Sequence, residues 1–326
     1  MMASSSPEMS VVLVTPDSYE AIRKTIKHLR AQTVSNRLEI VIVAPSAVTL
    51  HLDESDLKEF FQFHVVEVGG IRSTGGAIAA GVRQATGPIV TYAEEHSYPD
   101  PAWAEALIKA HRQPWAAVGA VIANANPGSM ISWAHVFIAY SPWVEPAVGG
   151  ETSFLAWHHT SYKRAILLEY GPRLQDLLET EGILHRDLRA RGYRLYLESA
   201  AKSYHVNVSL LSSFVRAELI GGRMFGAARA RHERWSVFRR LLYIGGAPLI
   251  PLVRLRRLLL EMRRSGRQRD LLPGVLPALI MGLIGHATGE ATGYAFGSGN
   301  ASERSLTFEL HRHHHLREQD RQAKAG

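Results

Sequence analysis

Cysteine is absent from this sequence of 326 residues. Without it the chain forms no disulfide bonds and offers no thiolate ligands to a metal, and a reducing compartment is allowed. Long apolar runs are also absent: residues 241–253 and 271–285 form stretches of thirteen and fifteen residues, each broken by prolines. A helix that spans a membrane needs about twenty apolar residues, so neither stretch is predicted to cross one. The N-terminal segment, residues 1–9, is short and polar, and it is not expected to be a secretory signal.

Lysine is missing from residues 211–270, although this segment is strongly basic. It contains fourteen arginines and four acidic residues, a net charge of +10 (14 − 4), whereas the whole chain carries +7. Excess positive charge of this kind suits nucleic acid or an anionic membrane surface, and the apolar runs beside the arginines favour the membrane. The hydrophobic fraction of 46% and the charged fraction of 21% are typical of a folded protein with one large or two ordinary domains.

Short β-branched runs alternate with segments of helical spacing in the N-terminal half. The predicted strands cover residues 10–15, 38–44, 65–68, 88–93 and 116–122. Apolar residues recur at helical intervals in 19–32 and 77–85. Strands that alternate with helices at short spacing predict an α/β fold with a doubly wound, mainly parallel sheet.

The sequence Glu94-Glu95-His96 directly follows the apolar run 88–93. In open α/β sheets, ligands bind outside the carboxyl ends of the strands. Carboxylate and imidazole groups at such an edge suit a divalent cation, which can in turn hold a diphosphate. For this motif taken alone, the alternative is a solvated acidic turn.

A glycine-rich loop at residues 69–76 opens the second predicted helix. Glycines let the backbone approach a phosphate, and a helix N-terminus offers free N–H donors. The loop lacks the Lys-Ser/Thr pair of a P-loop and the spacing of the dinucleotide-binding fingerprint. A plain helix-start loop is therefore an equal alternative to a phosphate site.

Several motifs stand in an order that resembles the family 2 glycosyltransferases, nucleotide-sugar enzymes with the GT-A fold. Gln32-Thr33 closes the first predicted helix, and Pro99-Asp100-Pro101-Ala102-Trp103 fits the family's proline-containing turn. Counting back from this turn places Glu94 and His96 where the family usually carries two aspartates. The resemblance extends over residues 10–207, and it implies a GT-A-like transferase domain.

The resemblance also implies a metal site and a donor site at the edge of the sheet. A divalent cation, Mn²⁺ or Mg²⁺, would neutralise the diphosphate of the nucleotide-sugar donor. Imidazole in place of a second carboxylate favours manganese over magnesium. The implied metal ligands are Glu94, His96 and His205. The implied donor-binding residues are Pro16, Arg72, Glu94 and Glu95.

Glu181 is the implied catalytic residue. The pair Thr180-Glu181 precedes Gly192-Tyr193 at the spacing of the family's Glu-Asp motif, so Glu181 takes the position of the usual catalytic aspartate. The helix dipole favours an ionised carboxylate at a helix N-terminus, and an ionised carboxylate near an acceptor hydroxyl suits a general base. The alternative is an ordinary first-turn carboxylate. His158 and His159 are interpreted either as contacts to a phosphate or hydroxyl or as surface histidines.

The C-terminal third departs from the α/β pattern. With the transferase domain at 1–207, residues 208–300 are predicted to form an Arg-rich helical region that lies in a membrane interface, peripheral or monotopic, at the cytoplasmic face. The alternative is a helical subdomain that packs on the transferase core or on a second chain. Residues 301–326 are predicted to be a polar, His-rich, disordered tail.

The resemblance therefore implies a metal-dependent inverting glycosyltransferase. Its expected partners are a nucleotide-sugar donor, an acceptor that is a lipid-linked sugar or a cell-envelope polysaccharide, and a membrane surface, but no nucleic acid. A second hypothesis is a transferase-like domain that has lost catalysis and serves as a membrane-attached binding or assembly partner, because both carboxylate pairs depart from the family pattern. A nucleotidyltransferase is disfavoured because Val14-Thr15-Pro16 is not followed by a glycine-rich basic loop.

Overall fold

The computed structural model describes residues 6–16 and 18–325. Residues 1–5 of the polar N-terminal segment, and residues 17 and 326, lie outside this range. The chain divides into two compact units. The first comprises Met1–Ala123 and Ala147–His205, and the second comprises Asn124–Pro146 and Val206–Gly326.

This division differs from the predicted domain boundary in one segment. Division at residue 207 leaves 124–146 in the transferase domain, whereas the structure groups it with the C-terminal unit. The reason is helix α5 (Met130–Tyr140), which packs against α9 (Leu211–His232) and α13 (Leu276–Phe296). An apolar helix inserted between two strands carries no local signal for the unit on which it packs.

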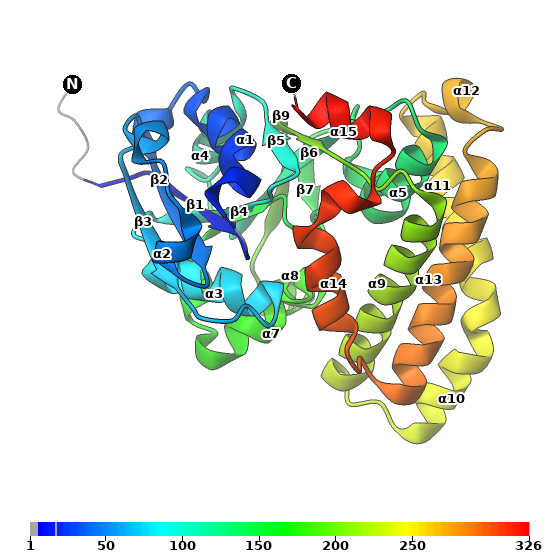
Figure 1. Ribbon diagram of the computed structural model, residues 1–326. Helices are drawn as coiled ribbons and strands as arrows, with labels where there is room; N and C mark the ends of the chain where they lie inside the picture. The colour runs from blue at the N-terminus through cyan, green and yellow to red at the C-terminus, as the bar shows by residue number, and fades with distance from the viewer. Residues whose placement is uncertain (1–5, 17, 326) are drawn as a thin grey trace. The chain divides into compact units, whose positions relative to one another are not determined.

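One mixed sheet of nine strands forms the centre of the first unit, as far as its described residues go (Figure 1). The strands are β1 Met9–Val14, β2 Leu38–Ala44, β3 Gln62–Glu67, β4 Ile89–Ala93, β5 Ser97–Pro99, β6 Ala117–Asn124, β7 Gly150–Thr152, β8 Thr160–Lys163 and β9 Leu195–His205. Their order is β3-β2-β1-β4-β8-β6-β9-β5, and β7 pairs with β9.

The predicted α/β sheet is confirmed, but its mainly parallel character is not. Parallel pairing joins β1 to β2, β1 to β4 and β2 to β3. In contrast, β8 is antiparallel to both β4 and β6, and β9 is antiparallel to both β5 and β7. The sheet is therefore parallel from β3 to β4, and these four pairs beyond β4 are antiparallel.

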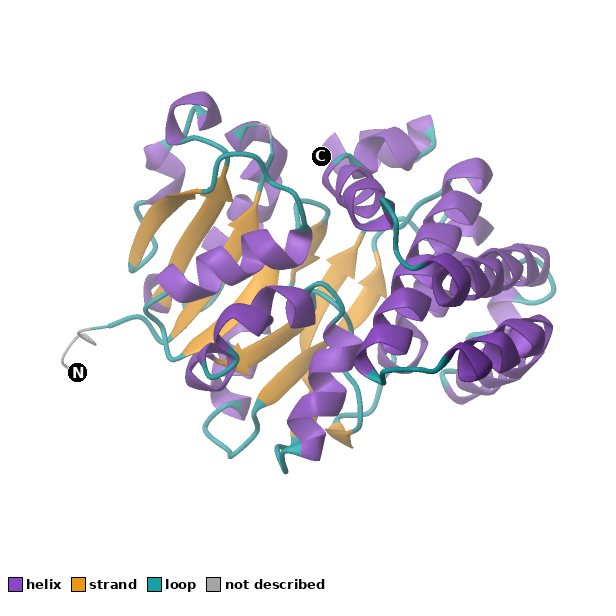
Figure 2. Cartoon of the chain, turned by 90° about the horizontal axis from the view of Figure 1, so that it is seen from below, coloured by secondary structure: helices purple, strands orange, loops and turns teal. Residues whose placement is uncertain are grey.

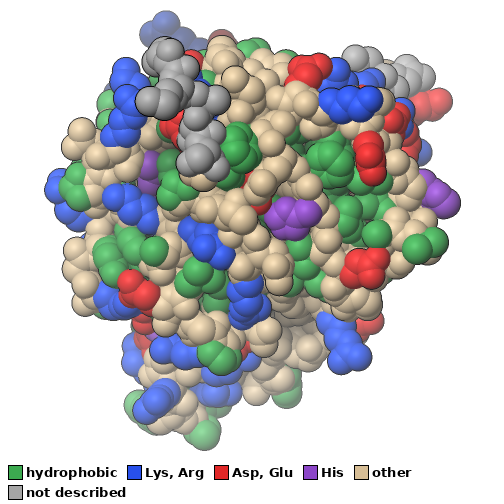
Figure 3. Space-filling model, turned by 90° about the vertical axis from the view of Figure 1, so that its left-hand side faces the viewer, with side chains coloured by type: hydrophobic (Ala, Val, Ile, Leu, Met, Phe, Trp, Pro, Cys, Tyr) green, Lys and Arg blue, Asp and Glu red, His purple; other side chains and the backbone are tan. Residues whose placement is uncertain are grey.

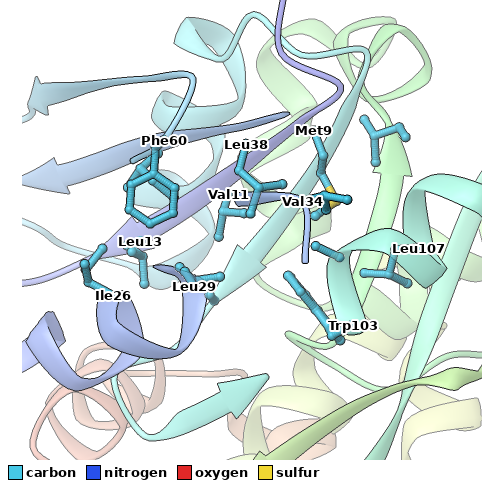
Figure 4. Close-up of a cluster of buried hydrophobic side chains, with 14 of the residues drawn as sticks. Met9, Val11, Leu13, Ile26, Leu29, Val34, Leu38, Phe60, Trp103 and Leu107 are labelled. Carbon is cyan, nitrogen blue, oxygen red and sulfur yellow. The ribbon is translucent and has the colours of Figure 1, made fainter. Parts of the chain in front are cut away.

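Helices pack on both faces of the sheet in the first unit (Figure 2). These helices are α1 Tyr19–Arg30, α2 Ala47–Leu50, α3 Thr74–Gln84, α4 Trp103–Ala110, α6 Arg164–Leu168, α7 Leu174–Leu178 and α8 Glu181–Ala190. Met9, Val11 and Leu13 of β1 point to one face, where they join Leu29 of α1 and Trp103 of α4 in one apolar cluster (Figure 4). Successive side chains of a strand point to opposite faces, and α3 contacts β1, β2 and β3.

Helices make up the second unit. In addition to α5, α9 and α13 they are α10 Val237–Gly246, α11 Ile250–Arg264, α12 Gln268–Leu271, α14 Ala301–Leu310 and α15 Glu318–Ala325, and the short 3-10 turn η5 (Ala247–Leu249) joins α10 to α11. The long helices α9 and α13 lie side by side (Figure 1). Among the described residues, no helix has both the length and the apolar character needed to span a membrane.

The expectation of a disordered tail at 301–326 is corrected by the structure. The described part of this segment forms helices α14 and α15. The prediction rested on the polar composition of this segment, but its apolar residues are buried: Leu306, Phe308, Leu310 and Leu316. His315 stacks on Phe308 with ring centroids 3.7 Å apart. Burial of these side chains supplies the free energy that a fully polar tail lacks.

His111, which follows α4, predicts a pH dependence of stability. Its ring nitrogen Nε2 lies 2.9 Å from Ser161 Oγ, and the residue is buried. Burial, with a smaller contribution from Lys163, lowers the pKa of His111 to about 3. Since an unfolded histidine has a pKa of about 6.5, the stability tied to the neutral ring is fully present above pH 6.5. It is lost as the pH falls from 6.5 towards 3.

We expect the free energy of unfolding at pH 5 to be lower than at pH 7 by about 2 kcal/mol through this residue. Urea unfolding of the chain and of the variant His111→Gln at both pH values measures it. Glutamine retains a hydrogen-bonding group beside Ser161 but does not titrate, so the variant should lose less stability on acidification. Equal losses in the two proteins would contradict a neutral, buried His111.

Candidate active site

Glu94 lies at the carboxyl edge of the parallel strands. Its strand, β4, ends at Ala93, which pairs with Leu13 near the end of β1. Thr25 of α1 donates a hydrogen bond of 2.9 Å from Oγ1 to the carbonyl oxygen of Glu94. This contact holds the backbone at the edge where ligands bind in sheets of this kind, and the Glu94 side chain is buried. The alternative of a solvated acidic turn is therefore wrong.

Four imidazole rings surround the Glu94 carboxylate. His158 Nδ1 lies 2.6 Å from Glu94 Oε1 in a hydrogen bond. The Nε2 atoms of His205, His159 and His96 lie 3.5, 3.6 and 3.7 Å from Glu94 Oε2. Across the described residues, Oε2 accepts no hydrogen bond. One buried carboxylate oxygen is thus bordered by three ring nitrogens and has no donor of its own.

The antiparallel strands bring these histidines to the edge. Because β8 runs opposite to β4, with Ser161 paired to Thr91, the residues just before β8 lie beside the end of β4. These residues are His158 and His159. Strand β9 runs opposite to β5 and ends at His205, which lies beside the start of β5. Residues that are distant in the sequence therefore meet around Glu94.

The protonation states of Glu94 and His159 suit metal ligands. Burial by itself raises the pKa of Glu94, but the positive charge of the surrounding imidazoles, His96 and His158 first, outweighs burial and holds that pKa well below its usual range. Burial lowers the pKa of His159 to about 4, against the opposing charge of Glu94. Glu94 is therefore ionised and His159 neutral near pH 7, as metal ligands must be.

The residues around Glu94 fit a divalent cation. One ligand atom each from Glu94, His159 and His205 lies within 4.8 Å of the other two. Bonds of about 2.0–2.2 Å from a metal to oxygen and nitrogen ligands suit this spacing. A donor set with two imidazoles favours manganese or a later transition metal over magnesium. The predicted set of Glu94, His96 and His205 shares two of these three residues, and the structure adds His159.

Glu181 is joined to Glu94 through a single residue. It is the first residue of α8 and is buried. The backbone N–H of His158 donates a hydrogen bond of 3.0 Å to Glu181 Oε1, while the His158 ring bonds to Glu94. Burial raises the pKa of Glu181, against the opposing effects of His158 and Tyr162. We expected the helix N-terminus to keep this carboxylate readily ionised, and burial has the larger effect.

Tyr162 and His185 support Glu181 from the protein interior. The Tyr162 hydroxyl donates a hydrogen bond of 2.8 Å to Glu181 Oε2 and lies 2.8 Å from His185 Nε2. Leu155 N–H donates to His185 Nδ1 at 3.5 Å. Burial lowers the pKa of His185 to about 3, so the ring is neutral and its Nε2–H donates to the tyrosine oxygen. A one-way chain of hydrogen bonds therefore orients the Glu181 carboxylate.

The other predicted donor residues lie along the same edge of the sheet but are not part of this cluster. Pro16 follows β1 and is half-buried, Arg72 lies in the exposed segment between β3 and α3, and Glu95 is buried next to Glu94.

The glycine-rich loop at 69–76 is a helix start. Ser73 Oγ accepts a hydrogen bond of 3.0 Å from Gly76 N and caps α3. Gly75 N–H donates to Glu179 Oε2 at 2.7 Å. A Cβ atom on Gly75 would lie 2.4 Å from Gln175 O of α7, so this glycine permits close packing of the backbone.

Prediction from the sequence missed three members of the site. His159 was one of two histidines with open roles, and its burial removes the surface interpretation. Tyr162 and His185 had no assigned role. The sequence carries only a weak signal for these two residues. Tyr162 stands two residues after the start of β8. His185 stands four residues after Glu181, and residues four apart share a helix face.

Comparison with known families identifies the family of the N-terminal part of the chain. The sequence model of the family described as Glycosyl transferase family 2 matches residues 10–171. That range contains the Glu94 motif, the proline-containing turn and the histidines before β8. The chain belongs to the family 2 glycosyltransferases, and it is a glycosyltransferase. No curated protein sequence matches it.

Solved structures share the fold at low sequence identity. The mannosyltransferase PcManGT from Pyrobaculum calidifontis, in complex with GDP-Man and Mn²⁺, is 16% identical; the match covers 95% of this chain and 88% of that chain, with a TM-score of 0.50. Residues 1–349 of S. aureus TarS, in complex with UDP, are 16% identical; this match covers 87% of this chain and 90% of that chain, with a TM-score of 0.45. The similarity to PcManGT supports a GT-A-like mixed sheet with a helical C-terminal region.

Proposed function

We propose that this glycosyltransferase moves a sugar from a nucleotide-diphosphate donor to an acceptor hydroxyl with inversion at the anomeric carbon. One observation carries the proposal: His158 bonds to Glu94 through its ring at 2.6 Å and to Glu181 through its backbone at 3.0 Å. A carboxylate suited to a metal and a carboxylate suited to a general base are thus held beside each other. This is the arrangement that departure of a diphosphate and activation of a hydroxyl require.

Glu94, His159 and His205 would hold the divalent cation, Mn²⁺ in preference to Mg²⁺. When bound, the cation supplies positive charge that stabilises the departing diphosphate. The structural relative PcManGT was solved with Mn²⁺ and GDP-Man, which supports a metal and a nucleotide sugar as the ligands of this fold. His96 lies farther from Glu94 Oε2 than the two other ring nitrogens that border it, and it would flank the cation.

Glu181 would act as the general base. The acceptor oxygen attacks the anomeric carbon from the face opposite the diphosphate, and the bond from that carbon to the diphosphate oxygen breaks as the new bond forms. The hydroxyl proton passes to the Glu181 carboxylate. Each of its oxygens already accepts one hydrogen bond, from His158 N–H or from Tyr162. A carboxylate oxygen has a second lone pair, which is available for the proton.

The acceptor in this proposal is a lipid-linked sugar or a growing cell-envelope polysaccharide, used at the cytoplasmic face of a membrane. Its support is the basic, apolar C-terminal region, where exposed apolar side chains gather on two helices. The second hypothesis, an inactive domain that binds or assembles other components, predicts no metal-dependent binding of any donor.

Titration calorimetry with UDP- and GDP-sugars, with and without Mn²⁺, tests the proposal. We expect one donor to bind more tightly with Mn²⁺, and the variants Glu94→Gln and His159→Gln to lose at least about tenfold in the Mn²⁺-dependent affinity, since even residues behind the ligands affect metal affinity by 10- to 100-fold. The matched controls Glu20→Gln and His51→Gln replace exposed residues of the same unit and should bind as the unchanged chain does. Donor binding that ignores Mn²⁺ would contradict the metal site.

A further inference from the structure

Two consecutive helices of the second unit expose a row of large apolar side chains, which we call the α10–α11 stripe. Its members are Phe238, Leu241, Leu242, Leu249, Leu252, Val253 and Leu260. Phe238 is 78% exposed and Leu252 is 65% exposed. Scattered single apolar residues are normal on a protein surface, whereas a contiguous group marks a site of interaction.

The members of the stripe recur at helical intervals. Phe238, Leu241 and Leu242 stand at positions i, i+3 and i+4 of α10, and Leu249, Leu252 and Val253 repeat this spacing through η5 into α11. Residues at these intervals lie on one face of a helix. The exposed face of each helix therefore carries several large apolar side chains, which an ordinary surface helix does not.

The inward faces of the same helices are already filled. Tyr243 and Ile244 of α10 pack with Trp235 and Tyr294, and Leu258 and Met262 of α11 are buried. Both helices contact α13. The stripe is therefore not part of the core of this unit, and its exposed side chains can contact a partner outside the chain.

The arginines of α11 on the side of the stripe are free to contact anions. Arg256 stands four residues after Leu252 and four before Leu260, so it shares their helix face, and Arg257 and Arg263 are also exposed. Within the described part of the chain, these three side chains make no hydrogen bond or ion pair. Arg256 and Arg263 border a hollow of about 370 Å³ that is otherwise lined by Leu252, Leu255, Leu259 and Leu260.

Other arginines of the basic segment have structural roles instead. Arg223 Nε donates to Gly297 O at 3.0 Å, and Arg229 pairs with Glu233 at 3.4 Å. Arg254 donates to Ile138 O at 3.3 Å. The net charge of the whole segment 211–270 therefore overstates the charge that a partner meets, and three of the arginines available to a partner lie on α11.

We propose that the α10–α11 stripe, with Arg256, Arg257 and Arg263, inserts into the boundary between headgroups and acyl chains of an anionic lipid monolayer. Apolar side chains beside arginines suit this boundary, where arginines reach the phosphates while their stems lie along the acyl chains. A second copy of the same surface would bring like charges together, and nucleic acid would leave seven large apolar side chains exposed. An anionic lipid monolayer offers phosphates to the arginines and acyl chains to the apolar side chains.

Charged and apolar side chains are differently arranged elsewhere on the chain. On the side shown in Figure 3, Lys, Arg, Asp and Glu side chains are interspersed with small groups of apolar side chains. This mixture of both signs is expected of a surface in contact with water. The proposal therefore predicts that lipid contact is confined to α10 and α11, and a label placed on either surface can test it.

The absence of native cysteine permits a single label on the full chain. We would attach an environment-sensitive fluorophore to the variant Leu242→Cys and, as the matched control, to Val48→Cys, which replaces an even more exposed apolar residue of α2. Vesicles of phosphatidylglycerol and phosphatidylcholine should shift the emission of the first label to the blue, and lipid-borne quenchers should reduce it. The control label should not respond.

Charge reversal and high salt separate the contribution of charge to vesicle binding from the contribution of the apolar side chains. Replacing Arg256, Arg257 and Arg263 by Glu should weaken vesicle binding at least roughly a hundredfold at low salt, because each arginine near an anionic surface contributes about fivefold. Replacing the exposed Arg112, Arg173 and Arg189 of the first unit by Glu is the matched control and should have little effect. High salt should weaken but not abolish binding of the unchanged chain, since screening leaves the apolar part intact.

Two results would overturn the proposal. One is an emission from the Leu242→Cys label that is the same with and without anionic vesicles. The other is a blue shift without vesicles that grows with protein concentration, which would assign the stripe to contact between copies of the chain. The triple variant Phe238→Ser, Leu241→Ser and Leu242→Ser, whose thermal unfolding should match that of the unchanged chain because these side chains are exposed, should lose vesicle binding. Donor binding is measured separately, so failure here leaves the proposed chemistry untouched.

Discussion

The variant Glu181→Gln should transfer sugar roughly 100- to 10,000-fold more slowly than the unchanged chain, which is the usual contribution of a positioned general base. Glutamine keeps the size of the side chain, and its amide oxygen can still accept the hydrogen bond from His158 N–H, although its NH2 group cannot accept the one from Tyr162. It cannot take a proton from the acceptor. Donor binding measured by calorimetry should be almost unchanged, so the loss should appear in kcat rather than in the affinity for the donor.

The pH profile distinguishes the base from a residue that only supports the site. Because burial raises the pKa of Glu181, kcat should fall as the pH decreases through that raised pKa, at a higher pH than an ordinary glutamate would give. The hydrogen bond from Tyr162 lowers the pKa of Glu181, so its loss in Tyr162→Phe should move the acidic limb to still higher pH. Replacing the exposed Glu105 by Gln is the control. A Glu181→Gln variant with full activity would assign the proton to another group.

The variant Gly222→Ala should destabilise the second unit by about 3 kcal/mol or more, the upper part of the range for overpacked interiors. A Cβ atom on Gly222 of α9 would lie 2.1 Å from the carbonyl oxygen of His286 in α13. That oxygen belongs to a helix backbone and cannot rotate away, so the two helices must separate. Their separation would also open the buried contact of His286 Nδ1 with Glu218 Oε2, now 3.1 Å long.

The neighbouring residue provides the matched control. A Cβ atom on Gly221 meets no atom within 4 Å, so Gly221→Ala should be neutral or stabilise the helix by about 0.5–1 kcal/mol. Thermal unfolding followed by circular dichroism measures both, and hydrogen exchange in α13 shows whether the loss is local to this helix pair. Equal effects of the two substitutions would mean that α9 and α13 do not approach each other as closely as described.

Local patterns in the sequence determined the first half of the sheet and the place of its catalytic edge. Strand β2 was predicted with its observed bounds at Leu38–Ala44, and β1 and β4 within one residue at each end. Such strands are readable because a short β-branched run between turn residues has few other stable conformations. Glu94 and Glu181 could be placed because a strand end and a helix start each have a recognisable sequence.

Tertiary structure alone decided which histidines surround Glu94. His159 stands 65 positions after Glu94 in the chain (159 − 94), and it approaches only because β8 enters between β4 and β6 in the antiparallel direction. Strand direction follows from pairing with distant partners, which leaves no periodic signature in the strand itself. The same is true of the chain of hydrogen bonds from His185 through Tyr162, since its two members come from a helix and a strand.

In the C-terminal unit, the composition of the sequence determined the excess of arginine and the lack of a membrane-spanning run. It did not determine how these residues are used. A count of charges treats Arg254 and Arg256 alike, yet one donates to a carbonyl oxygen inside the unit and the other is exposed beside the α10–α11 stripe. Helical periodicity shows that a face is apolar but not whether that face is covered. Packing of α10 and α11 on α13 decides it, because only contacts between distant segments determine which of two apolar faces becomes core.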